Sequence, residues 1–250
     1  MSVNLLGAAF RAAADPVLDL FLPERCPLCG GPGPEDHRGF CPDCLAGFTP
    51  LAEPFCPVCS LPFAGAGPAH PCSHCRKNPP AYTRIVAGGL FSGGMKNAVT
   101  GLKYGGNLTL LSPLEKIFAE MTVERISAMG PFDSVVPIPC GLISLRKRGF
   151  DLPAILARRA AKALGTRWRP RLLMRTRAGT RMAGLGLKER KAAVRGLYRA
   201  GEKAWGRVLL VDDVITSTLT VRAAARSLKR AGAEEVIVAA LARTPLAPMA

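Results

Sequence analysis

The sequence predicts an α/β protein with a parallel sheet, preceded by a smaller cysteine-rich module. Short apolar runs alternate with amphipathic stretches from residue 81 onward, and four Cys-x-x-Cys pairs lie between residues 26 and 75. A chain of 250 residues can also bury one sizeable core together with a satellite module. Because strands that alternate with helices form parallel sheets with right-handed crossovers, the larger part is expected to adopt that fold.

Residues 1–23 are predicted to form an amphipathic helix that breaks at Pro16. The segment carries charges at Arg11, Asp15 and Asp19. It lacks both the long apolar run of a transmembrane helix and the features of a secretory signal. We expect it to dock on the rest of a cytoplasmic protein. Peripheral attachment at the inner membrane face is the alternative.

Residues 24–80 are predicted to form a double zinc ribbon. Eight of the nine cysteines form the pairs Cys26/Cys29, Cys41/Cys44, Cys56/Cys59 and Cys72/Cys75. Two such pairs supply the four thiolates of a tetrahedral zinc site, so the count predicts two zinc ions. Gaps of 11 and 12 residues inside the two halves favour sequential pairing. Spacing leaves an interleaved pairing open.

The zinc ions are expected to be structural. Four thiolates leave no coordination position for a substrate, and metal binding would fold a segment rich in proline and glycine. A disulfide framework is the competing interpretation, but it needs an oxidising compartment and the chain shows no export signal. The three histidines, His37, His70 and His74, are expected to face solvent.

Residues 81–250 are predicted to form the second domain. Its strands are expected at residues 84–91, 133–139, 208–211 and 236–241, with a weaker candidate at 171–174. Its helices are expected at 113–126, at 152–164 after an Asp151 N-cap, and at 220–231 before Gly232. A basic turn at residues 103–107 precedes the first of these helices.

Three loops follow strands and should therefore meet at the carboxyl edge of the sheet, where such folds bind ligands. They are a basic loop at 140–150, a long glycine-containing loop at 176–194, and an acidic then hydroxyl-rich loop at 212–220. The length of the second loop is typical of a mobile lid. Together the three loops favour a phosphorylated sugar as ligand.

The net charge of +16 favours an anionic partner. Residues 141–199 hold 17 of the 34 basic residues, against only Asp151 and Glu189 as acids. We expect this segment to contact the phosphates of single-stranded DNA. Aromatic residues make up only 6% of the chain, which favours backbone contact over base stacking.

The stretch VLLVDDVITSTLT at residues 208–220 resembles the phosphoribosyl-pyrophosphate motif of type I phosphoribosyltransferases. Further motifs are LKYGG (102–106), VVPIP (135–139), RKRGF (146–150) and GLGLKERKAAVRG (184–196). With the cysteine module before them, they make the chain similar to the ComF family. The resemblance implies a type I phosphoribosyltransferase-like parallel sheet with an N-terminal double zinc ribbon. It also implies a role in DNA uptake, with competence or DNA-processing proteins as partners.

The resemblance further implies roles for individual residues. Asp212 and Asp213 would be catalytic and would face the ribose hydroxyls, directly or through magnesium. The other implied ligands of phosphoribosyl pyrophosphate are Thr216, Ser217, Thr218, Leu219 and Thr220 for the 5′-phosphate, Arg146, Lys147, Arg148 and Gly149 for the pyrophosphate, and Lys103, Arg177, Arg181 and Lys188. On the residues alone, Lys103 is equally well a surface lysine and Cys140 a small core residue.

The chain departs from the family pattern at several of these places. Thr218 stands where a glycine is usual, and a β-branched residue meets a steric cost in left-handed backbone. Asp151-Leu152 replaces Asn-Gln, Met182 replaces a glutamine and Ala193 replaces an asparagine. We therefore predict a DNA-handling protein that retains the fold. An active phosphoribosyltransferase, acting on a nucleobase or related amine, is the alternative.

Overall fold

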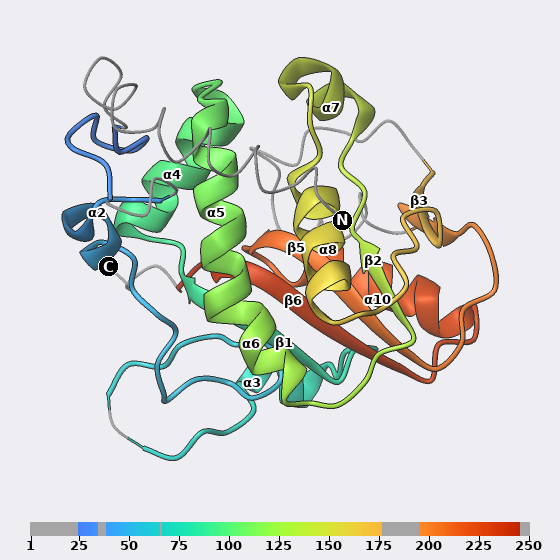
Figure 1. Cartoon of the computed structure of the whole chain (residues 1–250). Helices are drawn as coiled ribbons and strands as arrows, with labels where there is room; N and C mark the ends of the chain where they lie inside the picture. Colours follow the sequence, from blue (N-terminus) through green and yellow to red (C-terminus); the bar gives the residue numbers. More distant parts are fainter. Residues whose placement is uncertain (1–24, 35–38, 66, 177–195, 246–250) are drawn as a thin grey trace, which may run out of the picture.

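The computed structural model of the chain describes residues 25–34, 39–65, 67–176 and 196–245 (Figure 1). Its centre is a four-stranded parallel sheet with the strand order β1-β6-β5-β2. The strands are β1 (Arg84–Leu90), β2 (Ser134–Pro137), β5 (Arg207–Ile215) and β6 (Glu235–Arg243). The predicted α/β class and parallel sheet are confirmed, and the last strand of the chain lies inside the sheet.

Helices cover both faces of this sheet (Figure 1). The helices over the first face are α4 (Gly93–Tyr104), α5 (Leu111–Phe118) and α8 (Leu152–Ala163), and α10 (Leu219–Arg230) covers the second face. Side chains alternate along a strand, so Leu209 and Val211 join the first core while Val208 and Leu210 join the second. Two separate apolar layers therefore hold the sheet.

The cysteine-rich segment contributes to both layers. Cys26 and Cys41 pack in the first core, whereas Cys56 and Cys59 pack in the second. Short helices, α2 (Pro42–Ala46) and α3 (Ser73–Lys77), begin directly after a cysteine in each half. The ribbon segment thus straddles the sheet and packs on both faces.

The chain between the two cysteine groups runs beside β1. The Leu51 amide donates to the Gly88 carbonyl at 3.0 Å, and the Leu90 amide donates to the Thr49 carbonyl at 2.8 Å. A Cβ on Gly89 would lie only 2.7 Å from the Thr49 oxygen, so this close approach requires glycine. The segment covers the β1 edge, which is otherwise a template for non-native pairing.

Several predicted elements differ in extent. The predicted helix at 113–126 is α5, a π-helical turn (Ala119–Val123) and α6 (Glu124–Ser127) in succession, after a 3₁₀ turn (Leu108–Leu110). The strand predicted at 208–211 continues to Ile215 because β6 pairs with it that far. The predicted loop at 140–150 contains helix α7 (Leu142–Arg148).

The weak strand candidate forms a structure outside the main sheet. Here β3 (Leu173–Arg175) pairs antiparallel with β4 (Tyr198–Ala200) in a two-stranded sheet. The two strands border residues 177–195, which lie outside the described ranges, as do residues 1–24 with the predicted N-terminal helix. Within the described ranges, no helix has the length and apolar character that crossing a membrane requires.

Candidate functional site

The cysteines gather into two quartets in the sequential order. The first quartet is Cys26, Cys29, Cys41 and Cys44, and the second quartet is Cys56, Cys59, Cys72 and Cys75. Within each quartet all four sulfurs lie within 4.8 Å of one another. All nine cysteines are in described ranges and none forms a disulfide.

The sulfur spacing fits zinc. A tetrahedron with Zn–S bonds of about 2.3 Å has sulfur–sulfur edges of about 3.8 Å. The Cys29 and Cys41 sulfurs lie 3.7 Å apart, and those of Cys59 and Cys72 lie 3.8 Å apart. Backbone amides donate to these sulfurs, for example from Cys72 to Cys56 at 3.3 Å, as suits thiolates. The residues therefore form two closed four-thiolate sites whose geometry fits zinc.

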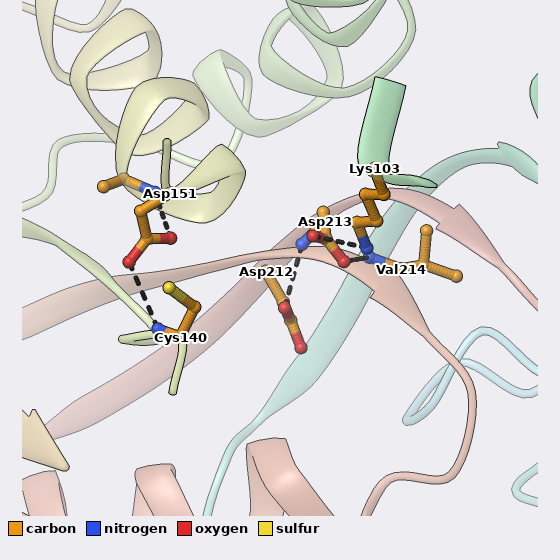
Figure 2. A network of polar contacts seen from close by, with 7 residues as sticks. Lys103, Cys140, Asp151, Asp212, Asp213 and Val214 are labelled. Carbon is orange, nitrogen blue, oxygen red and sulfur yellow. Dashed lines mark hydrogen bonds and ion pairs between the residues drawn. The ribbon is translucent and has the colours of Figure 1, made fainter. Parts of the chain in front are cut away.

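Asp212 and Asp213, the acidic pair, lie within the carboxyl-terminal part of β5 and point to opposite sides of it (Figure 2). Each carboxylate accepts a hydrogen bond from the next backbone amide, Asp212 from Asp213 at 2.9 Å and Asp213 from Val214 at 2.7 Å. These bonds fix both side chains at the carboxyl end of this inner strand. A carboxylate is therefore presented on each side of the strand.

Lys103 belongs to this site. Its Nζ lies 2.6 Å from Oδ2 of Asp213, and both side chains are largely buried, with 14% and 12% of their surface exposed (Figure 2). Lys103 comes from the last turn of α4, on the face of the sheet to which Asp213 points. The interpretation as an ordinary surface lysine is therefore wrong.

Asp212 has an unusual protonation equilibrium. Burial raises its pKa to about 7, and the neighbouring charge of Asp213 adds to the effect, while Lys103 opposes it. A carboxyl group with this pKa exchanges its proton near neutral pH. It can therefore donate or accept a hydrogen bond, and a cation would favour its charged form.

The loop predicted to bind phosphate, residues 216–220 and called the phosphate loop below, follows the acidic pair and leads into α10. Thr218 has φ −72° and ψ 6°, so the backbone at this residue is not left-handed. The steric cost predicted for threonine is absent here. Its hydroxyl is buried and accepts a 3.0 Å hydrogen bond from Nε of Arg222.

Two buried arginines connect the phosphate loop to the second quartet. Arg222 also donates to the Asn78 carbonyl at 2.7 Å and contacts the Cys75 sulfur at 3.8 Å. Arg243 donates from Nε to the Cys59 carbonyl at 3.1 Å. From Nη1 it also donates to the carbonyls of Ile215, at 2.8 Å, and Thr216, at 2.6 Å. The second zinc site thus supports the loop directly.

Sequence reasoning missed both arginines. Arg243 ends an apolar strand whose other residues are almost all buried, and Arg222 lies in an alanine-rich helix. A charge inside an apolar strand is a detectable signal, since buried arginines need partners. Their partners in the ribbon segment, Asn78, Cys75 and Cys59, lie more than 140 positions away and have no local signal.

Asp151 has a structural role. Its carboxylate accepts from the Ala154 amide at 3.4 Å, which caps α8 as predicted, and from the Cys140 amide at 3.1 Å (Figure 2). It therefore fixes the loop after β2. Burial and the charge of Asp151 raise the pKa of Cys140 to about 12, so this half-buried thiol stays protonated.

The basic residues of the RKRGF motif form the last turn of α7. Gly149 caps this helix with φ +80°, a left-handed conformation that favours glycine. The Arg148 guanidinium lies 5.0 Å from the ring centroid of Tyr104, next to Lys103 on α4. Arg146 and Lys147 are exposed. The structure thus brings Arg148 close to the end of α4.

Several predicted residues fall outside the described ranges. They are His37, Arg177, Arg181, Met182, Lys188 and Ala193. The other two histidines are exposed as expected, and His70 stacks on Phe63 with ring centroids 4.4 Å apart. Neither belongs to the cysteine quartets.

Comparisons with protein families match both parts of the chain. The double zinc ribbon domain matches residues 17–76, and the phosphoribosyl transferase domain matches residues 186–248. The first match contains both cysteine quartets, and the second contains the acidic pair and the phosphate loop. Both families agree with the architecture described above.

Comparisons with curated proteins align most of the chain. It is 28% identical over 228 residues to the DNA utilization protein YhgH of Salmonella typhimurium, covering 90% of this chain and 99% of that protein. It is 29% identical over 229 residues to YhgH of Escherichia coli strain K12, with the same coverage. It is 23% identical over 225 residues to the Competence protein F of Haemophilus influenzae, covering 88% and 96%.

Proposed function

The chain belongs to the ComF family, and on that premise we propose that it handles incoming single-stranded DNA during DNA uptake. The observation that carries the proposal is the alignment, over nearly their whole length, with relatives named for DNA utilization and competence. The net charge of +16 suits a partner with a phosphate backbone. The chain would act in the cytoplasm beside competence or DNA-processing proteins.

Binding to a labelled oligonucleotide tests this function. Fluorescence anisotropy with a 30-nucleotide oligothymidine should show binding whose affinity falls steeply with salt, because bound phosphates release counterions. Deletion of the gene from its own host should lower the number of transformants while leaving growth unchanged. Absent binding, or binding that does not depend on salt, contradicts the proposal.

We also propose that the acidic pair and the phosphate loop form a site for phosphoribosyl pyrophosphate. The acidic carboxylates would accept hydrogen bonds from the ribose hydroxyls. The amides at the amino end of α10 would hold the 5′-phosphate, where the helix dipole favours an anion. Lys103 and Arg148 would face the pyrophosphate end. Magnesium, held by the carboxylates and the ligand, would neutralise the phosphate charge.

Calorimetric titration with phosphoribosyl pyrophosphate and magnesium tests this site. Asp212→Asn combined with Asp213→Asn should weaken binding at least tenfold, because both carboxylate acceptors are lost. Glu234→Gln removes one exposed acid outside the site and should leave the affinity unchanged. No binding to the unmodified protein at millimolar ligand contradicts the proposal.

An active phosphoribosyltransferase is the second candidate function. The observation favouring it is the acidic pair at the carboxyl edge of the sheet, with a phosphate loop next to it. Attack by an amine on the anomeric carbon would release pyrophosphate, and basic residues would stabilise that leaving group. Pyrophosphate release with a panel of nucleobases tests the activity. Binding of phosphoribosyl pyrophosphate without release of pyrophosphate would contradict the enzymatic activity and leave only the ligand-binding proposal.

A further inference from the structure

A cavity lies between α10, β4 and α3, on the face of the sheet opposite Lys103. Its volume is about 530 Å³. Its walls include Arg222, Arg226 and Arg230 of α10, His74 of α3 and Tyr198 of β4. Asp212, Asp213 and Lys103 do not line it. The cavity therefore does not include the acidic pair, but Leu219 of the phosphate loop lines it and Arg222 contacts Thr218 of that loop.

Three arginines line this cavity from a single helix face. Arg222, Arg226 and Arg230 are each four residues apart, so they stack along one side of α10 with a rise of about 6 Å between them. Arg226 and Arg230 are exposed, and neither forms an ion pair or hydrogen bond within the described ranges. The described lining residues include no carboxylate. The wall therefore presents uncompensated positive charge.

The innermost arginine has a different role from the other two. Arg222 is buried, and its guanidinium is held by Thr218, Asn78 and the Cys75 sulfur. The Cys75 sulfur, 3.8 Å away, would offset part of its charge as a thiolate when zinc is bound. The charge available to a ligand therefore comes from Arg226 and Arg230, and Ser227 lines the same cavity.

We propose that this cavity binds phosphates of single-stranded DNA, and this rests on the DNA-handling function proposed above. Two exposed guanidinium groups at one-turn spacing can contact successive phosphates, and arginine suits bidentate phosphate binding. Among the described lining residues, Tyr198 is only 7% exposed and His74 is the one exposed ring, so little aromatic surface is available for base stacking. We therefore expect contact mainly with the DNA backbone.

This assignment places the DNA contact outside residues 141–199, where the sequence predicts it. Residues 141–199 hold half of the basic residues, yet the arginines of the cavity lie at 222–230. The cavity lies on the opposite face of the sheet from Lys103 and Asp213, but it adjoins the phosphate loop at Leu219. Arg222 gives the two sites a shared residue.

The test compares two double variants with equal loss of charge. Arg226→Gln with Arg230→Gln removes the cavity charges. The control, Lys162→Gln with Lys229→Gln, removes two exposed lysines that do not line the cavity, one of them on the opposite face of the sheet. Anisotropy with the same 30-nucleotide oligothymidine should show at least tenfold weaker binding for the arginine variant and less than twofold for the control. The salt slope should fall by about 1.4, which corresponds to two lost single-strand phosphate contacts.

The outcomes separate the two proposals. Equal losses in both variants, or an unchanged salt slope, would overturn the cavity assignment alone. Absent DNA binding by the unmodified protein would overturn the DNA function as well. An arginine variant that loses binding to phosphatidylglycerol vesicles but retains oligothymidine binding would assign the cavity to a membrane instead. Zinc content and phosphoribosyl-pyrophosphate affinity should match the unmodified protein, which shows that the fold is intact.

Discussion

Thr218 fits the phosphate loop because the backbone there does not need a glycine. Its φ is −72°, and its hydroxyl satisfies a buried arginine instead of facing solvent. The sequence alone could identify the missing glycine but not the φ angle of its replacement. In the folded chain the Thr218 hydroxyl accepts from Arg222, which also donates to the distant Asn78 carbonyl. The substitution therefore does not argue against the site.

Removing only the Thr218 hydroxyl should destabilise the protein. Thr218→Val keeps the shape but leaves Nε of Arg222 without its acceptor, which should cost about 1–3 kcal/mol. Thr218→Ser keeps the hydroxyl and should cost less. The free energy of unfolding from urea titration measures both. Equal destabilisation by the two variants would show that packing, and not the hydrogen bond, matters here.

Asp212 should make stability depend on pH. Burial raises its folded pKa to about 7 from an ordinary value of 3.8, so the folded state holds an extra proton between these values. Stability is therefore lost as pH rises through this window. The shift corresponds to at most about 4 kcal/mol, and solvent screening should reduce it to about 1–3 kcal/mol.

Asp212→Asn isolates this effect. Its stability advantage over the unmodified protein should grow from about pH 4 to pH 7 and stay constant above. Thermal unfolding of both proteins in parallel, without added magnesium, measures the difference, and acid release of zinc affects both alike. An advantage that does not change with pH would contradict the raised pKa.

The second zinc site and the phosphate loop act as one structural unit. Arg243 joins the Cys59 carbonyl to those of Ile215 and Thr216, and Arg222 joins Thr218 to α3. The first quartet instead packs with the core under α4. Loss of the two zinc ions should therefore have different local effects.

Hydrogen exchange can show this difference. Cys72→Ser with Cys75→Ser should speed amide exchange over residues 215–220 and weaken phosphoribosyl-pyrophosphate binding. Cys41→Ser with Cys44→Ser serves as the control and should leave exchange in that loop at the unmodified rate. Faster exchange in both variants to the same extent would mean general unfolding.

Elements with strong apolar patterns were predictable, whereas those set by distant contacts were not. The four strands of the sheet and helix α8 with its Asp151 cap were all predicted, because burial fixes their pattern. Helix α7 has no buried residue, and the β3–β4 pair is too short to show a period. The cysteine quartets were predictable from spacing, but Lys103 as a partner of Asp213 required the fold.

Removal of zinc should lower the thermal stability of the whole molecule. Cysteines of both quartets belong to the two cores that hold the sheet. Trp168 and Trp205 are the only tryptophans, and both lie outside the ribbon segment. A chelator that removes zinc should lower the midpoint of their fluorescence transition by about 5–10 °C. An unmoved tryptophan transition after zinc release would contradict this coupling.

The position of β6 has a consequence for synthesis of the protein. The last strand lies between β1 and β5, so no earlier part of the chain can complete the sheet. A nascent chain can bind zinc as soon as residue 75 leaves the ribosome. Arg243, which anchors the phosphate loop, is made only with β6. A product truncated before residue 235 should therefore bind zinc but lack a phosphate site. Cellular quality control would act on it as a partly folded chain.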